Sequence, residues 1–220
     1  MDDDTRDLAL LEQWLDGRPE AGQELFSRHY DALYRFFDRK IDGDVEDLVH
    51  DTFIRFERVT STFQRASTLR TYLFGIANKL LLEFLRKKAK AQGRNVDFSV
   101  ESVGEVGGSP ASHLERKQEH QLLRLALREI PLESQVLLEL YMFEEFTGGQ
   151  LAVIMEAPED TVRSRISRAK RLLERKMNEI ATDPDQLHDA LATLSTWLER
   201  IGREARVRYP GIPGDDADRC

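Results

Sequence analysis

Apolar residues recur every three or four positions along most of this chain, and this spacing restricts the fold more than any other feature of the sequence. A clear example is the run Leu69, Leu73, Ile76, Leu80 and Phe84, whose side chains would share one face of a helix. No segment alternates apolar and polar residues convincingly, as a half-buried strand would. The spacing therefore predicts an all-α fold.

A segment near the middle of the chain interrupts the helical pattern. It contains acids and the run Gly107-Gly108-Ser109-Pro110, and it has no periodic apolar face, so we expect a flexible acidic linker. We therefore predict two small helical domains and a C-terminal extension that carries one amphipathic helix and a loose tail. The boundaries are a first domain at 1–95, the linker at 96–111, a second domain at 112–180 and the extension at 181–220.

The charge of the chain is unevenly distributed. The formal net charge is −8, yet residues 61–95 carry a net charge of +7 and residues 159–177 carry +4 when Lys and Arg are counted against Asp and Glu. Local potential, and not net charge, decides whether a surface attracts phosphate. The pattern therefore predicts two nucleic-acid contacts within an acidic protein.

The second basic segment lies in a helix-turn-helix pattern. Thr147-Gly148-Gly149-Gln150 has the spacing of a capping box and opens a short helix, Glu156-Ala157-Pro158 forms a turn, and a second helix follows from Glu159 to about Met177. Arginine suits this position because its planar guanidinium can bond base edges and phosphates bidentately. An ordinary solvated helix face is the alternative. The predicted DNA contacts are Thr161, Arg163, Ser164, Arg165, Ser167, Arg168 and Lys170.

Several functional classes are not supported by the sequence. The only cysteine is Cys220, the last residue, and the amino terminus reads Met-Asp-Asp-Asp, unlike a secretory signal. The histidines have no zinc-site spacing, and neither a Ser-His-Asp nor a P-loop pattern occurs. We expect a cytoplasmic protein with no catalytic residues, metal, cofactor, small-molecule substrate or membrane contact.

Three stretches resemble, in order, functional segments of extracytoplasmic-function (ECF) sigma factors, a group of the sigma-70 family of bacterial RNA polymerase subunits. Residues 44–53 resemble the polymerase-binding segment, residues 69–77 the promoter-melting segment, and residues 161–169 the recognition helix. The resemblance extends over about residues 20–177. It implies that the first domain is sigma region two and that the second is sigma region four.

The resemblance also implies roles for particular residues. The first domain would bind the polymerase clamp and open the minus-ten element, and the second would read the minus-thirty-five element. The partners would be core RNA polymerase and promoter DNA. The resemblance leaves open whether an anti-sigma factor also binds the chain. The implied polymerase contacts are Asp44, Glu46, Asp47 and Asp51, and the implied minus-ten contacts are Arg65, Asn78, Lys79, Arg86, Lys87 and Lys88.

One departure from the family and two alternatives bear on these expectations. Glu156 stands where the family usually has a glycine. If that position requires a positive φ, a non-glycine residue there would cost roughly 1 kcal/mol.

A stand-alone helix-turn-helix regulator is the alternative function. The apolar stripe from Leu187 to Ile201 would pack within the chain or against a separate partner.

Overall fold

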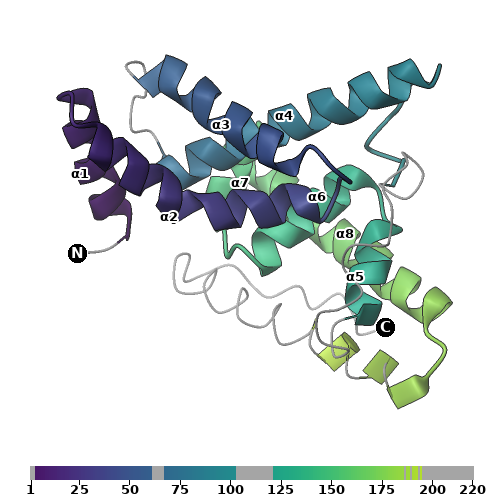
Figure 1. Cartoon of the computed structure of the whole chain (residues 1–220). Coiled ribbons are helices and arrows are strands. Elements are labelled where there is room, and N and C mark those ends of the chain that lie inside the picture. The colour runs from purple at the N-terminus through teal and green to yellow at the C-terminus, as the bar shows by residue number, and fades with distance from the viewer. Residues whose placement is uncertain are drawn as a thin grey trace.

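A computed structural model of the chain describes residues 3–60, 67–102, 121–185, 187, 188, 190–192 and 194. Helices are the regular structure of these residues, together with one isolated bridge between Ser102 and Pro131. The prediction of an all-α fold is therefore confirmed (Figure 1). The helices are α1 Asp3–Leu15, α2 Pro19–Asp38, α3 Val45–Val59, α4 Leu69–Ala91, α5 Gln121–Arg128, α6 Leu132–Met142, α7 Gly148–Ile154 and α8 Glu159–Ile180.

The first four helices form the first half of the molecule around an aromatic core. α1 packs on α2, and α3 packs on both α2 and α4. Phe36, Phe56 and Phe74 are fully buried, and the rings of Phe36 and Phe74 meet edge to face with centroids 5.6 Å apart. Aromatic burial of this kind contributes heavily to core stability. The apolar stripe expected on α4 faces this core, with Leu69 and Leu73 fully buried.

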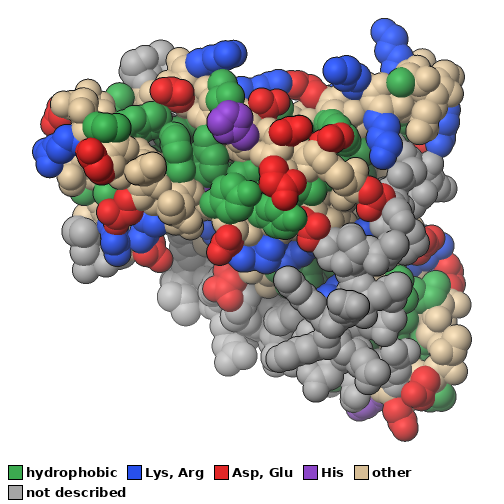
Figure 2. Space-filling view, viewed as in Figure 1, with side chains coloured by type: hydrophobic (Ala, Val, Ile, Leu, Met, Phe, Trp, Pro, Cys, Tyr) green, Lys and Arg blue, Asp and Glu red, His purple; other side chains and the backbone are tan. Residues whose placement is uncertain are grey.

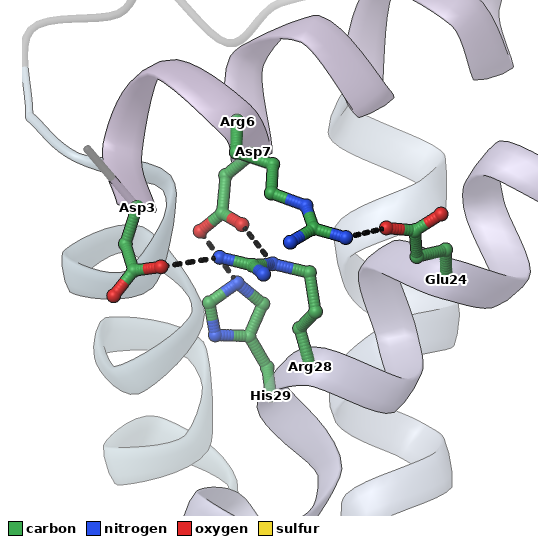
Figure 3. Close-up of polar contacts among 6 residues, drawn as sticks. All are labelled: Asp3, Arg6, Asp7, Glu24, Arg28 and His29. Carbon is green, nitrogen blue, oxygen red and sulfur yellow. Dashed lines mark hydrogen bonds and ion pairs between the residues drawn. The ribbon is translucent and has the colours of Figure 1, made fainter. Parts of the chain in front are cut away.

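Polar contacts fasten α1 to α2 (Figure 3). The buried carboxylate of Asp7 accepts hydrogen bonds from Arg28 and contacts His29, both at 2.8 Å, while Arg28 also donates to Asp3. Burial acts to raise the pKa of Asp7, but the hydrogen bonds and charges of His29 and Arg28 outweigh it and lower that pKa. An ionised Asp7 therefore holds the two helices together.

The first residues of the expected linker pack against the second half of the molecule. Phe98 is buried, and its carbonyl accepts a hydrogen bond from the backbone of Glu133 at 3.1 Å. The carbonyl of Glu101 likewise accepts from Leu132, and the guanidinium of Arg86 lies 5.4 Å from the Phe98 ring centroid. A single phenylalanine is enough to anchor a turn that has no periodic pattern. Residues 103–111 lie outside the described part of the chain.

The second half consists of α5 to α8 and part of the C-terminal extension. α8 packs on α5, α6 and α7. In the extension, Ala190 and Leu194 are buried, and Leu187 and Leu191 pack against the core, so this part of the predicted stripe packs within the chain. The remainder of the stripe, including Ile201, lies outside the described residues.

Candidate nucleic-acid interface

The helix-turn-helix begins as the sequence predicts. The side chain of Gln150 accepts a hydrogen bond from the Thr147 backbone at 2.8 Å, and the Thr147 hydroxyl accepts one from the Gln150 backbone at 3.3 Å. This reciprocal capping box satisfies two backbone donors at the start of α7. Leu151 and Ile154 bury the inner side of α7, which positions the turn that follows.

The turn between α7 and α8 has a left-handed residue at the position where the resemblance leads one to expect a glycine. Glu156 has φ 49°, in the left-handed region. A non-glycine residue in this region costs roughly 1–2 kcal/mol. Glu156 therefore holds a positive φ without being a glycine, and Pro158 follows at the N-cap position of α8.

α8 separates an apolar face from a basic face. Arg163, Arg165 and Arg168 are exposed, as are Ser164 and Ser167, while Thr161 and Lys170 are partly exposed. Arg163 reaches Glu159 at 3.5 Å, but Arg165 and Arg168 have no ion-pair partner among the residues the structure describes. Two guanidinium groups are therefore available for a ligand. The buried side chains on the other face are Val162, Ile166, Ala169, Leu173 and Met177.

A second group of basic side chains lies at the end of α4. Arg86, Lys87 and Lys90 are exposed and Lys88 is partly exposed. Figure 2 shows Lys and Arg side chains around the end of this helix, which projects from the body of the molecule. A projecting basic helix end suits contact with nucleic-acid phosphates.

The other minus-ten candidates differ in exposure. Asn78 is only 7% exposed, so its side chain cannot contact DNA in this conformation, contrary to the expectation from the resemblance. It follows Ala77, which is fully buried, on the face of α4 that packs inward. Lys79 is exposed but forms an ion pair with Glu156 of the turn before α8. Arg65 lies outside the described residues.

Acidic side chains surround the start of α3. Asp44, Glu46, Asp47 and Asp51 are all exposed, and acidic side chains appear near the start of this helix in Figure 2. Asp44 occupies the N-cap position of α3 with φ 54°, and its side chain makes no capping bond. In the part of the chain that the structure describes, no group of acidic, His or Cys side chains is arranged to hold a metal.

Sequence reasoning missed the contact between the two halves of the molecule. Lys40 donates to Glu139 at 2.5 Å, and Arg70 donates to Glu144 at 2.7 Å, over separations of 99 and 74 residues. The ring centroids of Phe74 and Phe146 lie 5.0 Å apart across the same boundary. No short-range pattern connects such distant residues, so spacing alone carries no signal for this interface.

Burial affects the charges at this boundary. Burial lowers the pKa of Lys40, and attraction to Glu139 opposes that shift. Burial acts to raise the pKa of Glu139, but Lys40 and Arg39 outweigh it, and the pKa of Glu139 is lowered. Burial likewise lowers the pKa of Arg70. Lys40 and Glu139 thus form a buried pair of ionisable side chains, whereas Arg70 is partly exposed.

The fold and these surfaces define an all-helical DNA-binding protein of the helix-turn-helix class. Two family models match it, Sigma-70 region 2 over residues 25–91 and Sigma-70 region 4 over residues 120–173. The chain belongs to the sigma-70 family, in its extracytoplasmic-function group, and is a sigma factor for promoter-specific transcription initiation. No helix within the described residues is both long and apolar enough to cross a membrane.

Similar proteins cover most of the chain. It is 27% identical over 183 residues to the ECF RNA polymerase sigma-E factor of Haemophilus influenzae, covering 78% of this chain and 95% of that one. The sigma-E factor of Escherichia coli K12 is 26% identical over 189 residues, covering 80% and 97%. Among solved structures, CnrH in complex with the cytosolic domain of CnrY shares the fold, with a TM-score of 0.59 and 20% identity over 80% of this chain and 99% of that one.

A second solved structure has a similar fold. The sigma factor RpoE in complex with the anti-sigma factor NepR, from Bartonella quintana, has a TM-score of 0.56 and 22% identity, covering 74% of this chain and 100% of that one.

Proposed function

We propose that the chain works through three surfaces: a minus-thirty-five surface on α8, a minus-ten surface on α4 and a polymerase-docking surface on α3. In this proposal residues 1–95 act as sigma region two and residues 112–180 as sigma region four. Residues 96–111 connect them, and residues 181–220 are an added extension. The exposed arginine face of α8 is the observation that carries the proposal.

The minus-thirty-five surface consists of the basic side of α8. Its apolar side is buried against α5, α6 and α7, so the exposed side can enter a major groove without disturbing the core. Arg165 and Arg168 supply guanidinium groups suited to base edges, and Arg163 and Lys170 supply phosphate contacts. Thr161, Ser164 and Ser167 are small enough to let the backbone approach DNA.

The minus-ten surface follows α4 from Lys79 to its basic end. Arg86, Lys87 and Lys88 would neutralise duplex phosphates, which gives salt-dependent affinity without sequence information. Lys79 would reach DNA once it leaves Glu156. We assign Asn78 to packing, because its side chain is buried.

The polymerase-docking surface consists of Asp44, Glu46, Asp47 and Asp51. Acidic side chains at this density steer and orient a basic partner surface, here the clamp of core RNA polymerase. Because RpoE was solved in complex with the anti-sigma factor NepR, and CnrH in complex with the cytosolic domain of CnrY, we propose an anti-sigma factor as a further partner. The proposed location is the cytoplasm, where polymerase works, and we propose no catalysis by the chain itself.

The alternative is a stand-alone regulator, and binding assays separate the two. The isolated chain and the chain mixed with core polymerase are titrated into promoter-containing duplexes. A sigma factor forms a stable complex with core polymerase and shifts promoter fragments tightly only as holoenzyme. Tight, specific shifts by the chain alone, without polymerase binding, would favour the regulator.

A further inference from the structure

Gly75 lies within α4, at a position where the helix itself gains nothing from a glycine. Its backbone does not have the positive φ that favours glycine at Gly17, Gly43 and Gly93. Relative to alanine, a glycine in the interior of an exposed helix weakens folding by about fivefold, because its backbone loses more freedom on folding. A glycine with this cost needs a reason, either in the packing of the protein or in something that the protein binds.

Packing supplies such a reason for another helical glycine, but not for Gly75. A Cβ added to Gly22 on α2 would lie 2.8 Å from the side chain of Trp14, so an alanine there would press on the indole ring. A Cβ added to Gly75 would meet no heavy atom of the described residues within 4 Å, apart from its chain neighbours and its own helix backbone. Gly75 is partly exposed, so this open space faces the outside of the molecule.

The side chains beside Gly75 indicate what could occupy this space. Tyr72 and Ile76 are only partly buried, and Lys79, one turn further along α4, is exposed. An aromatic side chain with a cation nearby suits an unpaired nucleic-acid strand, because its bases stack on aromatic rings whatever their sequence. Duplex DNA presents phosphates to its surroundings, and the basic end of α4 suits those better.

We propose that Gly75 is a contact position for one unpaired DNA strand, which lies directly on the backbone of α4 beside Tyr72. This inference rests on the proposed function of α4 as the minus-ten surface. Glycine lets a ligand approach the helix backbone closely, because no side chain lies between them.

The neighbouring side chains would hold the strand on either side of Gly75. The Tyr72 ring packs against Phe56, with centroids 6.2 Å apart, which fixes its position while part of the side chain stays exposed for a base. Lys79 pairs with Glu156 in this structure, and a phosphate of the strand can replace that carboxylate. Gly75 lies between these two contacts along the helix.

A side chain at position 75 should therefore help folding and harm binding. Gly75→Ala should raise the midpoint of thermal unfolding by about 2–4 °C. The same methyl group should weaken binding of the unpaired strand by about fivefold, and the larger side chain of Gly75→Leu by about fiftyfold or more, because both intrude on a close contact. A glycine with only a structural role would not separate stability from binding in this way.

The experiment measures DNA binding by the holoenzyme, formed from core polymerase and the full chain. Fluorescence anisotropy is read with two short DNAs that span the minus-ten element of a promoter mapped with the wild-type holoenzyme. One is the single strand that the wild type binds more tightly, and the other is the paired duplex. We expect both Gly75 variants to lose affinity for the single strand and to keep their affinity for the duplex within about twofold.

The matched control is Gly22→Ala, whose new methyl group meets Trp14. It should lower the unfolding midpoint of the isolated chain, measured by circular dichroism, and leave the ratio of the two DNA affinities unchanged. If Gly75→Leu does not fold, Gly75→Ala carries the test, because it adds a single methyl group.

Four results would overturn the proposal. They are unchanged single-strand binding by the folded Gly75 variants, equal losses on the single strand and the duplex, a Gly75→Ala chain less stable than wild type, and a wild-type holoenzyme that binds neither single strand. Failure of the proposed function would appear separately, as a wild-type chain that does not bind core polymerase.

Discussion

The carboxylate of Asp7 on α1 lies 2.8 Å from Nε2 of His29 on α2, and both side chains are almost completely buried (Figure 3). The same carboxylate accepts a hydrogen bond from Arg28. The pKa of Asp7 is lowered below 3.8 because these partners outweigh the effect of burial. The contact therefore joins α1 to α2 through an ionised acid.

This contact should make stability depend on pH. Since the folded pKa lies below the unfolded one, the contribution of Asp7 is complete above the unfolded pKa and is lost as pH falls through the folded pKa. At pH 7, Asp7→Asn should lower the free energy of unfolding by about 2 kcal/mol. Urea titrations from pH 7 to pH 3 should show a difference that shrinks at low pH. Glu24→Gln, which breaks the exposed pair with Arg6, is the control and should change little.

Polymerase docking should depend on the acidic surface of α3. Reversing Asp47 and Asp51 to Lys should weaken binding to core polymerase about tenfold or more, because like charges then face each other. Circular dichroism should stay helical, since both side chains are exposed. Glu57→Lys, exposed near the end of the same helix, is the matched control. Equal retention of all variants on immobilised core polymerase would place the docking surface elsewhere.

The recognition helix should depend on Arg165 and Arg168. Alanine at an arginine that reads a base should cost about 1–3 kcal/mol and relax specificity at one promoter position. At a phosphate-contacting arginine the loss should be uniform across sequences, with a shallower salt dependence. Arg175→Ala, exposed further along α8, is the control. Holoenzyme footprints upstream of minus ten that survive both substitutions would contradict the assignment.

The strained turn offers a test that is independent of function. Glu156→Gly and Glu156→Ala both remove the pair with Lys79, so they differ only in the cost of the left-handed conformation. The glycine variant should be more stable than the alanine variant by about 1 kcal/mol in urea unfolding. Equal stabilities would mean that the turn relaxes away from a positive φ.

The C-terminal extension should protect the second half of the molecule. Truncation after Ile180 removes Ala190 and Leu194, which are buried, and exposes their apolar partners. We expect the truncated chain to bind core polymerase but to aggregate more, as measured by light scattering. A chain that ends before Pro210 is the control. Complete loss of polymerase binding would mean that the extension belongs to the sigma core.

The sequence predicts local features of this fold better than distant ones. The capping box of Thr147 and Gln150 and the inward stripe of α4 follow from short-range spacing, and both are present. Phe98 in the linker was missed because one isolated aromatic has no periodicity. The Lys40–Glu139 pair was missed for a different reason: charged residues normally face solvent, and nothing in the order of residues brings these two together.

In the candidate site, too, local features could be predicted from the sequence and features that depend on distant packing could not. The positions of the exposed arginines of α8 could be predicted, because the spacing of apolar residues after the turn assigns the arginines to the opposite face of an amphipathic helix. The burial of Asn78 could not be predicted by resemblance, because its exposure depends on how α4 packs within the molecule. Which residues contact promoter DNA remains a prediction for the experiments above.

Run-off transcription with purified core polymerase tests the proposed function most directly. Core polymerase is incubated with fragments of the source genome, with and without the wild-type chain, and transcripts are mapped at their 5′ ends. We predict discrete start sites that require the chain, share sequence elements near minus ten and minus thirty-five, and lose activity with Arg165→Ala and Arg168→Ala. Transcription that is identical with and without the chain, although the chain is folded and core polymerase responds to a known sigma factor, would contradict the assignment.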